Sequence, residues 1–124
     1  MKKEIKNILI VDDEEDICFL VKSILKRKSS ARIDICTSVK DAIEKLSSED
    51  YDLAFFDMRL NDGTGSDLID FVHSKLDTNP YIAVISAYTS DADMEKLREL
   101  KINQFIPKPL SREKIIGCYV DAMS

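Results

Sequence analysis

The sequence predicts an α/β protein with a doubly wound (βα)5 architecture, in which five parallel strands form one sheet with helices on both faces. Short apolar runs alternate five times with segments in which apolar residues recur at helical spacing. Strands that alternate with helices along a chain pair in parallel, through right-handed crossovers. A length of 124 residues suits one such unit, so residues 1–124 are expected to form one domain.

The first part of the chain contains two strand–helix pairs. Residues 5–11 are rich in β-branched side chains, as in a buried strand. The apolar positions of the next segment fall at i, i+3, i+4, i+7 and i+8, which predicts an amphipathic helix that buries Ile17, Leu20, Val21, Ile24 and Leu25. Ile33 and Ile35 alternate with polar residues, as in a half-buried strand. Ser38, three residues before Asp41, predicts the start of a helix that carries Val39, Ala42, Ile43 and Leu46.

The third unit begins with a buried-strand candidate at residues 53–56, which ends at Asp57. Residues 61–65, Asn-Asp-Gly-Thr-Gly, predict a turn-rich loop. A helix that begins near Ser66 would bury Leu68, Ile69, Val72 and Leu76. Residues 81–85 are the fourth strand candidate.

The remaining elements follow the same order. Ser90 and Asp93 predict the cap of a fourth helix, which carries Met94, Leu97 and Leu100. Phe105 and Ile106 form a short fifth strand before Pro107-Lys108-Pro109. Ser111 predicts the cap of a last helix with the apolar residues Ile115, Ile116, Tyr119 and Val120.

The residues that follow the strands carry the candidate chemistry. For a doubly wound sheet of this size the expected strand order is 2-1-3-4-5, with a switch point between strands 1 and 3. Ligands bind such sheets outside the carboxyl ends of the strands, at the switch point. The residues at these strand ends are Asp12, Asp13, Asp57, Ser86 and Lys108. Three carboxylates, a hydroxyl and an ammonium group are therefore expected to converge on one edge.

The three carboxylates of Asp12, Asp13 and Asp57 require a cation if they meet there. At separations of about 5 Å, each like-charged pair costs roughly 3 kcal/mol at an effective dielectric constant of 20. Ligation by a few oxygen atoms suits Mg²⁺, which keeps several waters and often binds a phosphate as well. Lys108 beside such an ion would complete a receptor for a phosphoryl group. A carboxylate can itself act as the nucleophile and form an aspartyl-phosphate.

The net charge of the chain has a local origin. The sequence contains 18 Lys and Arg against 23 Asp and Glu, so the formal net charge is −5. Residues 12–16 are five consecutive acids, and outside them acidic and basic residues are equal in number. We interpret Glu14, Glu15 and Asp16 as charges at a helix start, where they complement the helix dipole.

Composition also argues against several classes of protein. No face rich in Lys and Arg is predicted, so nucleic acid is not expected as a direct ligand. No apolar run reaches the roughly 20 residues needed to span a bilayer, and the N-terminus lacks a signal peptide's apolar stretch. Cys18, Cys36 and Cys118 lie far apart, which predicts free thiols in a reducing compartment. We therefore expect a cytoplasmic protein that does not contact the membrane.

These motifs, taken in order, strongly resemble the receiver domain of two-component response regulators, a flavodoxin-like fold typified by the chemotaxis regulator. The resemblance covers essentially the whole chain. It rests on an ordered set of motifs: Leu9-Ile10-Val11-Asp12-Asp13-Glu14, Phe56-Asp57-Met58, Gly65 eight residues after Asp57, Ser86-Ala87 and Lys108-Pro109. Each motif alone is weak, but all of them stand at their predicted strand ends.

The resemblance implies a phosphoacceptor and a set of metal ligands. Asp57 would accept the phosphoryl group. Asp13 would bind Mg²⁺ directly, and Asp12 would act through a water molecule. The backbone carbonyl of Arg59 would supply a further ligand. The implied metal site therefore consists of Asp12, Asp13, Asp57 and Arg59.

The resemblance also implies residues that respond to the phosphoryl group. Lys108 would pair with the phosphoryl oxygens, and its bond to Pro109 would be cis. The Ser86 hydroxyl would donate a hydrogen bond to the phosphoryl group and move toward it. Phe105 occupies the aromatic switch position and would turn inward when Ser86 moves.

The implied function is that of a signalling module. A sensor histidine kinase or a histidine phosphotransfer protein would donate the phosphoryl group in an Mg²⁺-dependent reaction. The fourth helix, fifth strand and last helix would then change their common surface and bind a downstream protein target. The chain would catalyse only its own phosphorylation and dephosphorylation, so we do not expect an enzyme. Whether phosphorylation produces a homodimer stays open, as does the choice between a stand-alone regulator and a piece of a longer one.

Two alternatives remain. A degenerate receiver would bind partners without phosphorylation. An aspartate-nucleophile phosphatase of the haloacid-dehalogenase type is less favoured, because that family has a second Asp two residues after the nucleophile, where this chain has Arg59. A dinucleotide site is not indicated, since no G-x-G-x-x-G motif follows the first strand.

The chain departs from the common receiver pattern at several positions. Asn61 replaces a frequent proline, which predicts a less rigid loop after Asp57. Lys101-Ile102 replaces the usual Gly-Ala after the fourth helix, so the end of that helix is in question. Phe105 replaces the commoner Tyr. Arg59 and Tyr88 are bulky residues at positions that tune the access of water, which predicts slow dephosphorylation.

Overall fold

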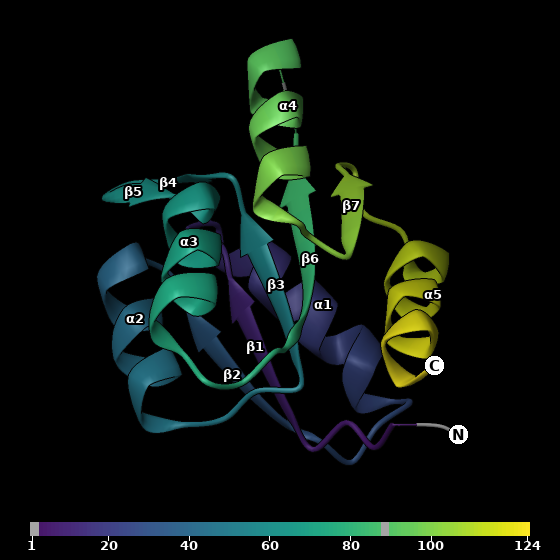
Figure 1. Cartoon of the computed structure of the whole chain (residues 1–124). Coiled ribbons are helices and arrows are strands. Elements are labelled where there is room, and N and C mark those ends of the chain that lie inside the picture. The colour runs from purple at the N-terminus through teal and green to yellow at the C-terminus, as the bar shows by residue number, and fades with distance from the viewer. Residues whose placement is uncertain (1–2, 88–89) are drawn as a thin grey trace.

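The computed structural model describes residues 3–87 and 90–124 of the chain. Within them, a five-stranded sheet has the order β2-β1-β3-β6-β7, and all of its strand pairs are parallel (Figure 1). The strands are β1 Asn7–Val11, β2 Arg32–Cys36, β3 Leu53–Asp57, β6 Tyr81–Ser86 and β7 Gln104–Pro107. Because β6 and β7 are the fourth and fifth strands of this sheet along the chain, the predicted order 2-1-3-4-5 is confirmed.

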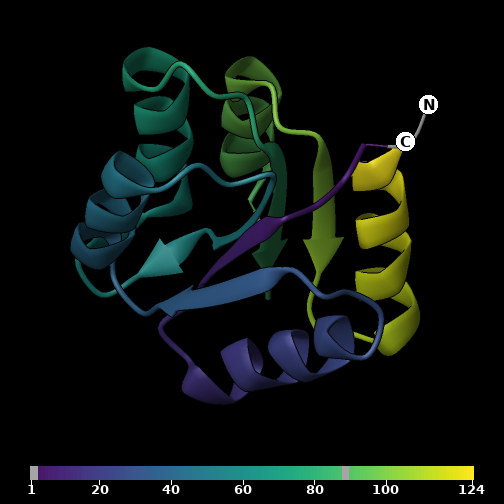
Figure 2. The ribbon, with the colours of Figure 1, turned by 90° about the horizontal axis from the view of Figure 1, so that it is seen from below.

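Helices cover both faces of the sheet. They are α1 Glu15–Lys26, α2 Val39–Ser48, α3 Gly65–Lys75, α4 Asp91–Leu100 and α5 Arg112–Met123. Helices α1 and α5 pack on one face, whereas α2, α3 and α4 pack on the other (Figure 2). Each helix of the described residues lacks the length and apolar character needed to span a membrane.

The central strands bury side chains on both faces because successive residues of a strand point in opposite directions. In β1, Ile8 and Ile10 pack beneath α1 and α5, and Leu9 and Val11 pack beneath the other three helices. All five residues of β3 are buried. Apolar runs without polar alternation are typical of parallel strands that are covered on both faces.

One apolar position that we expected on the buried face of its helix is exposed instead. Leu20 of α1 is 42% exposed. Val120 lies in α5, as predicted, and is 50% exposed. Helix α1 turns the stripe of Cys18, Val21 and Leu25 toward the sheet, and Leu20 lies two positions from Cys18, on the other side of the helix. The prediction for Leu20 was wrong because α1 is apolar over more than one face, with Phe19 exposed as well, so spacing alone did not define the buried stripe.

The loop predicted at residues 61–65 contains regular structure. Strands β4 Arg59–Leu60 and β5 Gly63–Thr64 pair antiparallel and form a small hairpin. Helix α3 begins at Gly65, one residue before the predicted Ser66, and Thr64 and Asp67 form its capping box. The reciprocal bonds of this capping box end the hairpin and start the helix at the same place.

The predicted helix caps are present. The side chains of Ser38, Ser90 and Ser111 accept hydrogen bonds from the third residue of α2, α4 and α5, respectively. Helix α4 ends at Leu100, and the residue that follows, Lys101, has a φ of 60° in the left-handed region. A non-glycine residue thus occupies the conformation for which the usual glycine is suited.

Candidate functional site

The sheet brings Asp12, Asp13 and Asp57 together, as the strand order predicts. Val11 ends β1 opposite Phe56 of β3, so the acids that follow these two residues leave the same edge of the sheet. Each of the three acids has a carboxylate oxygen, and these oxygens lie within 4.8 Å of one another. This spacing agrees with the crowding that the sequence predicts.

Asp12 is the most enclosed of the three acids. Its side chain is fully buried, and its Oδ1 accepts a hydrogen bond from Glu14 N at 2.9 Å. Its Oδ2 accepts no hydrogen bond from the described residues, although Lys108 Nζ lies 3.1 Å away as an ion pair. Burial, reinforced by the charge of Asp57, raises the pKa of Asp12 to about 6, against the opposing effects of Glu14 N and Lys108.

Lys108 is the cation of the site. Its Nζ donates to Asp57 Oδ2 at 3.2 Å and lies 3.7 Å from Glu14 Oε1. Burial alone would lower the pKa of Lys108, but the Asp12 and Asp57 carboxylates outweigh it and raise the pKa. Lys108 N donates to Ser86 O at 2.8 Å, and the Lys108–Pro109 peptide bond is cis, as expected.

A cavity of 260 Å³ opens at this edge. It is lined by Asp13, Glu14, Asp57, Arg59, Ser86, Ala87 and Lys108. Asp57 and Ser86 are 5% and 3% exposed, so only a small part of each faces the cavity. Asp57 Oδ1 accepts a hydrogen bond from Arg59 N at 3.3 Å, which brings the backbone of the β4 strand close to the carboxylate.

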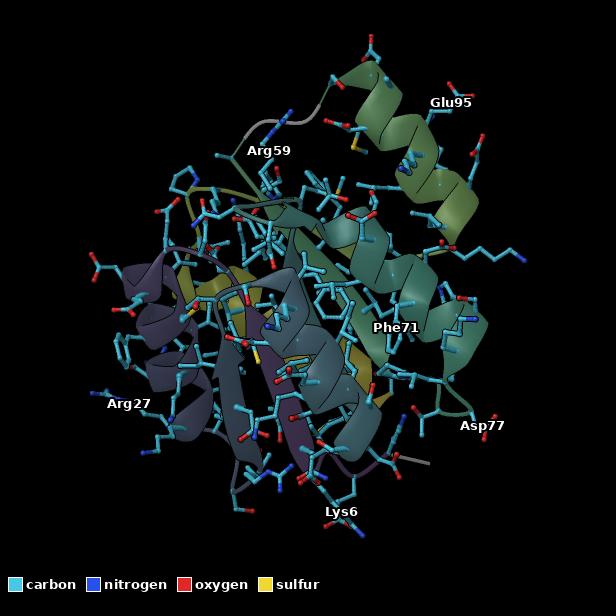
Figure 3. All side chains as sticks on the ribbon, turned by 90° about the vertical axis from the view of Figure 1, so that its left-hand side faces the viewer. Lys6, Arg27, Arg59, Phe71, Asp77 and Glu95 are labelled. Atoms are coloured by element: carbon cyan, nitrogen blue, oxygen red, sulfur yellow. The ribbon has the colours of Figure 1, made fainter. Side chains whose placement is uncertain are left out.

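The side chains of two further predicted residues contact other elements of the fold. Phe105 lies in β7 opposite Val84, is half-buried, and packs with the core beneath α2, α3 and α4. The Arg59 side chain is 70% exposed and forms an ion pair with Asp93 of α4 at 3.5 Å. Figure 3 shows Arg59 at the same edge of the molecule as α4. Tyr88, which we expected to act with Arg59, lies outside the described residues.

Glu14 belongs to the site although we interpreted it as a helix-start charge. It stands at the N-cap position of α1 without capping the helix through its side chain, whereas Glu15 and Asp16 lie in the first turn as expected. Its carboxylate lies near Lys108 and lines the cavity. Its position directly after the acid pair was the available signal, but the pairing with Lys108 depends on the tertiary structure.

The residues fit a hard divalent cation. Three convergent carboxylates provide the oxygen ligands that Mg²⁺ prefers, and the unbonded Oδ2 of Asp12 can accept a further partner. A nearby cation would also offset the burial and the repulsion by Asp57 that raise the pKa of Asp12. The donor set is therefore consistent with the Mg²⁺ site expected from the sequence.

Comparison with curated proteins gives relatives of one kind. The chain is 39% identical over 107 residues to the response regulator protein PilR of Pseudomonas aeruginosa, a match that covers 82% of this chain and 22% of PilR. It is 34% identical over 115 residues to the sensory transduction protein LytT of Enterococcus faecalis, which covers 88% of this chain and 44% of LytT. The chain thus spans less than half the length of these two relatives.

Solved structures show the same fold. A CheY-like response regulator receiver domain protein from Methanospirillum hungatei superposes with a TM-score of 0.87 and 25% identity, over 95% of this chain and 93% of that one. A two-component response regulator from Clostridium difficile gives 0.85 and 26%, over 94% of each chain. The family model described as the response regulator receiver domain matches residues 8–119, which include the acidic cluster and Lys108. The chain therefore belongs to the response regulator receiver domains of two-component systems.

Proposed function

We propose that the chain accepts a phosphoryl group on Asp57 from a sensor histidine kinase or a histidine phosphotransfer protein, in an Mg²⁺-dependent reaction. The observation that carries the proposal is the 3.2 Å contact between Lys108 Nζ and Asp57 Oδ2, beside a cluster of three carboxylates. A nucleophilic carboxylate is thus held next to a fixed positive charge at an open cavity. This arrangement suits phosphoryl transfer, which depends mainly on positioning and charge neutralisation.

In the reaction, an Asp57 oxygen forms a bond to phosphorus while the bond from phosphorus to the donor's leaving atom breaks. The raised pKa keeps Lys108 charged, so its ammonium group can pair with the phosphoryl oxygens. The Ser86 hydroxyl would donate a hydrogen bond to the same group. Asp13, Asp57 and the Arg59 carbonyl would hold Mg²⁺, with Asp12 acting through a water molecule, and the ion would neutralise the charge of the carboxylates and the phosphoryl oxygens.

The phosphoryl group would act by shifting an equilibrium between inactive and active conformations. Ser86 stands at the end of β6, and Phe105 lies in the adjacent strand β7. Movement of Ser86 toward the phosphoryl group would allow Phe105 to turn inward and change the surface of α4, β7 and α5. We place the downstream protein target at this surface and the protein in the cytoplasm. The chain would act as a phosphoryl acceptor and not as an enzyme on a separate substrate.

A solved relative supports dimerisation as one consequence of activation. The beryllofluoride-activated receiver domain of NtrC4 is a dimer, is 25% identical to this chain and superposes with a TM-score of 0.84. We propose that phosphorylation favours a homodimer of this chain too. Light scattering of the unmodified and phosphorylated protein at equal concentration tests this, and an unchanged mass would contradict it.

Intact-mass spectrometry tests the phosphorylation itself. After incubation with a small acyl phosphate and Mg²⁺, we expect a mass increase of about 80 Da, which corresponds to one phosphoryl group. The adduct should be absent from Asp57→Asn and strongly reduced when the metal is chelated. A wild-type protein without an adduct would favour the alternative of a receiver that binds partners without phosphorylation. An adduct that persists in Asp57→Asn would place the acceptor elsewhere.

A further inference from the structure

The loop after Asp57 is tied to helix α2 by the side chain of Asp62. Asp62 lies at the turn between β4 and β5, and its Oδ1 and Oδ2 accept hydrogen bonds from Val39 N at 2.7 Å and from Lys40 N at 3.0 Å. Val39 and Lys40 are the first two residues of α2, and their amides have no acceptor within the helix. Figure 1 shows the hairpin above α2.

The electrostatics of this contact are favourable. A carboxylate at a helix N-terminus interacts with the positive end of the helix dipole, and its hydrogen bonds are charge-assisted. The bonds from Val39 N and Lys40 N hold the pKa of Asp62 below its ordinary value. Asp62 is therefore ionised at neutral pH, and both of its oxygens are engaged.

The hairpin connects the turn held by Asp62 to the backbone beside Asp57. Leu60 pairs with Gly63, and Arg59 pairs with Thr64, so a fixed turn fixes the backbone of both β4 residues. Gly63 lies close to α2, because a Cβ built there would stand 3.0 Å from Val39 Cγ2. At the other end of the β4 strand, Arg59 N donates to Asp57 Oδ1. The hydrogen-bonded β4–β5 hairpin thus connects Asp62 to the Asp57 carboxylate.

We propose that Asp62 is a positioning residue that holds the Arg59 backbone beside Asp57 and thereby sets the affinity of the site for a divalent cation. The inference rests on the proposed function, which assigns the Arg59 carbonyl to Mg²⁺. Many receivers have a proline at the position of Asn61, where a fixed φ angle stiffens the chain. In this chain the hydrogen bonds of Asp62 supply that stiffness from outside the loop.

Calorimetric titration with Mg²⁺ tests the proposal. We expect Asp62→Ala to weaken Mg²⁺ binding about tenfold, which is the lower end of the loss typical when a group that supports a metal ligand is removed. Ser38→Ala is the matched control. It removes the cap between Ser38 Oγ and Asp41 N at the same end of α2, but leaves Asp62 and the hairpin in place. We expect Ser38→Ala to lower stability and to bind Mg²⁺ as tightly as the wild type.

A conservative variant separates positioning from general stability. Asp62→Asn keeps one acceptor oxygen and should bind Mg²⁺ with an affinity between those of the wild type and Asp62→Ala. Binding and anchoring are also linked in the reverse direction, so Mg²⁺ should slow hydrogen exchange at Val39 N and Lys40 N in the wild type but not in Asp62→Ala.

Each other outcome overturns the proposal in a recognisable way. Equal Mg²⁺ affinity in Asp62→Ala and the wild type would show that the anchor does not position the site. Equal weakening in Ser38→Ala would show that the effect comes from the stability of α2. A wild type that binds no Mg²⁺ would remove the metal site of the proposed function, and the inference with it.

Discussion

At the scale of single residues, Asp12 lies in an environment that disfavours its ionised form. Its carboxylate is fully buried, stands within a cluster of three acids, and has one oxygen without a hydrogen bond from the described residues. Only Lys108 offers a nearby positive charge to that oxygen among these residues. Burial and the charge of Asp57 disfavour the charged form, so the pKa of Asp12 is raised to about 6.

The raised pKa of Asp12 predicts an unusual dependence of stability on pH. Between the ordinary value of 3.8 and about 6, folded Asp12 keeps a proton that the unfolded chain has released. Without divalent cations, the free energy of unfolding should therefore rise as the pH falls from 7 through 6, a gain that is complete only below the ordinary value of 3.8. Urea denaturation at several pH values measures this rise.

Two comparisons assign the effect to Asp12. Asp12→Asn should lose this part of the pH dependence, and Mg²⁺ should reduce it in the wild type by favouring the ionised carboxylate. An equal rise in Asp12→Asn would attribute the pH dependence to other groups.

At the scale of elements, two helical glycines have opposite roles. Gly65 is the first residue of α3 and lies against the backbone of Asp57 and Met58. A Cβ built on it would stand 2.4 Å from the Asp57 carbonyl oxygen and 3.2 Å from Met58 Cα. These neighbours are backbone atoms and cannot rotate away. Gly117 lies within α5, and a Cβ there would meet nothing within 4 Å. Gly65 thus allows α3 to approach the end of β3.

Alanine at each glycine should therefore change stability in opposite directions. Gly65→Ala should destabilise the protein by about 1–3 kcal/mol, the range typical of overpacking. It should also slow formation of the Asp57 adduct, because the strand end must move. Gly117→Ala should stabilise the protein by about 0.5–1 kcal/mol through helix propensity. Urea unfolding of both variants provides the measurement, and a neutral Gly65→Ala would contradict the close approach.

At the scale of the whole molecule, the three cysteines probe both sides of the sheet. Cys18 and Cys118 lie in the core beneath α1 and α5, and Cys36 lies in the core on the opposite face. All three are free and buried, so the expectation of free thiols is confirmed. Burial raises the pKa of Cys18 and Cys118 to about 12 and that of Cys36 to about 11, so few thiolates form in the folded protein at neutral pH.

Alkylation should therefore report unfolding of the molecule as a unit. We expect all three thiols to resist iodoacetamide under native conditions and to react at similar rates, each proportional to the unfolded fraction. Mass mapping of the alkylated cysteines along a urea series measures the three rates. The fully denatured chain, in which every thiol reacts, serves as the control. Early reaction of Cys36 alone would show that the face beneath α2, α3 and α4 opens separately.

The extent of sequence-based prediction follows from how local each feature is. The strand–helix alternation and the serine caps are local patterns, and parallel pairing sends Asp12, Asp13 and Asp57 to one edge. The stripe of α1 was placed incorrectly at Leu20 because burial depends on which face meets α5 and the sheet. The β4–β5 hairpin was missed because two-residue strands leave almost no pattern.

The sequence by itself determined the sheet order, the edge at which the acids meet and the family of the chain, because each follows from short motifs at strand ends. Only the tertiary structure decided that Lys108 contacts Glu14 and that Asp62 ties the turn between β4 and β5 to α2. These contacts join segments that are distant in the chain, 23 residues apart for Asp62 and Val39. Their formation depends on how helices pack against the sheet, which no local pattern encodes.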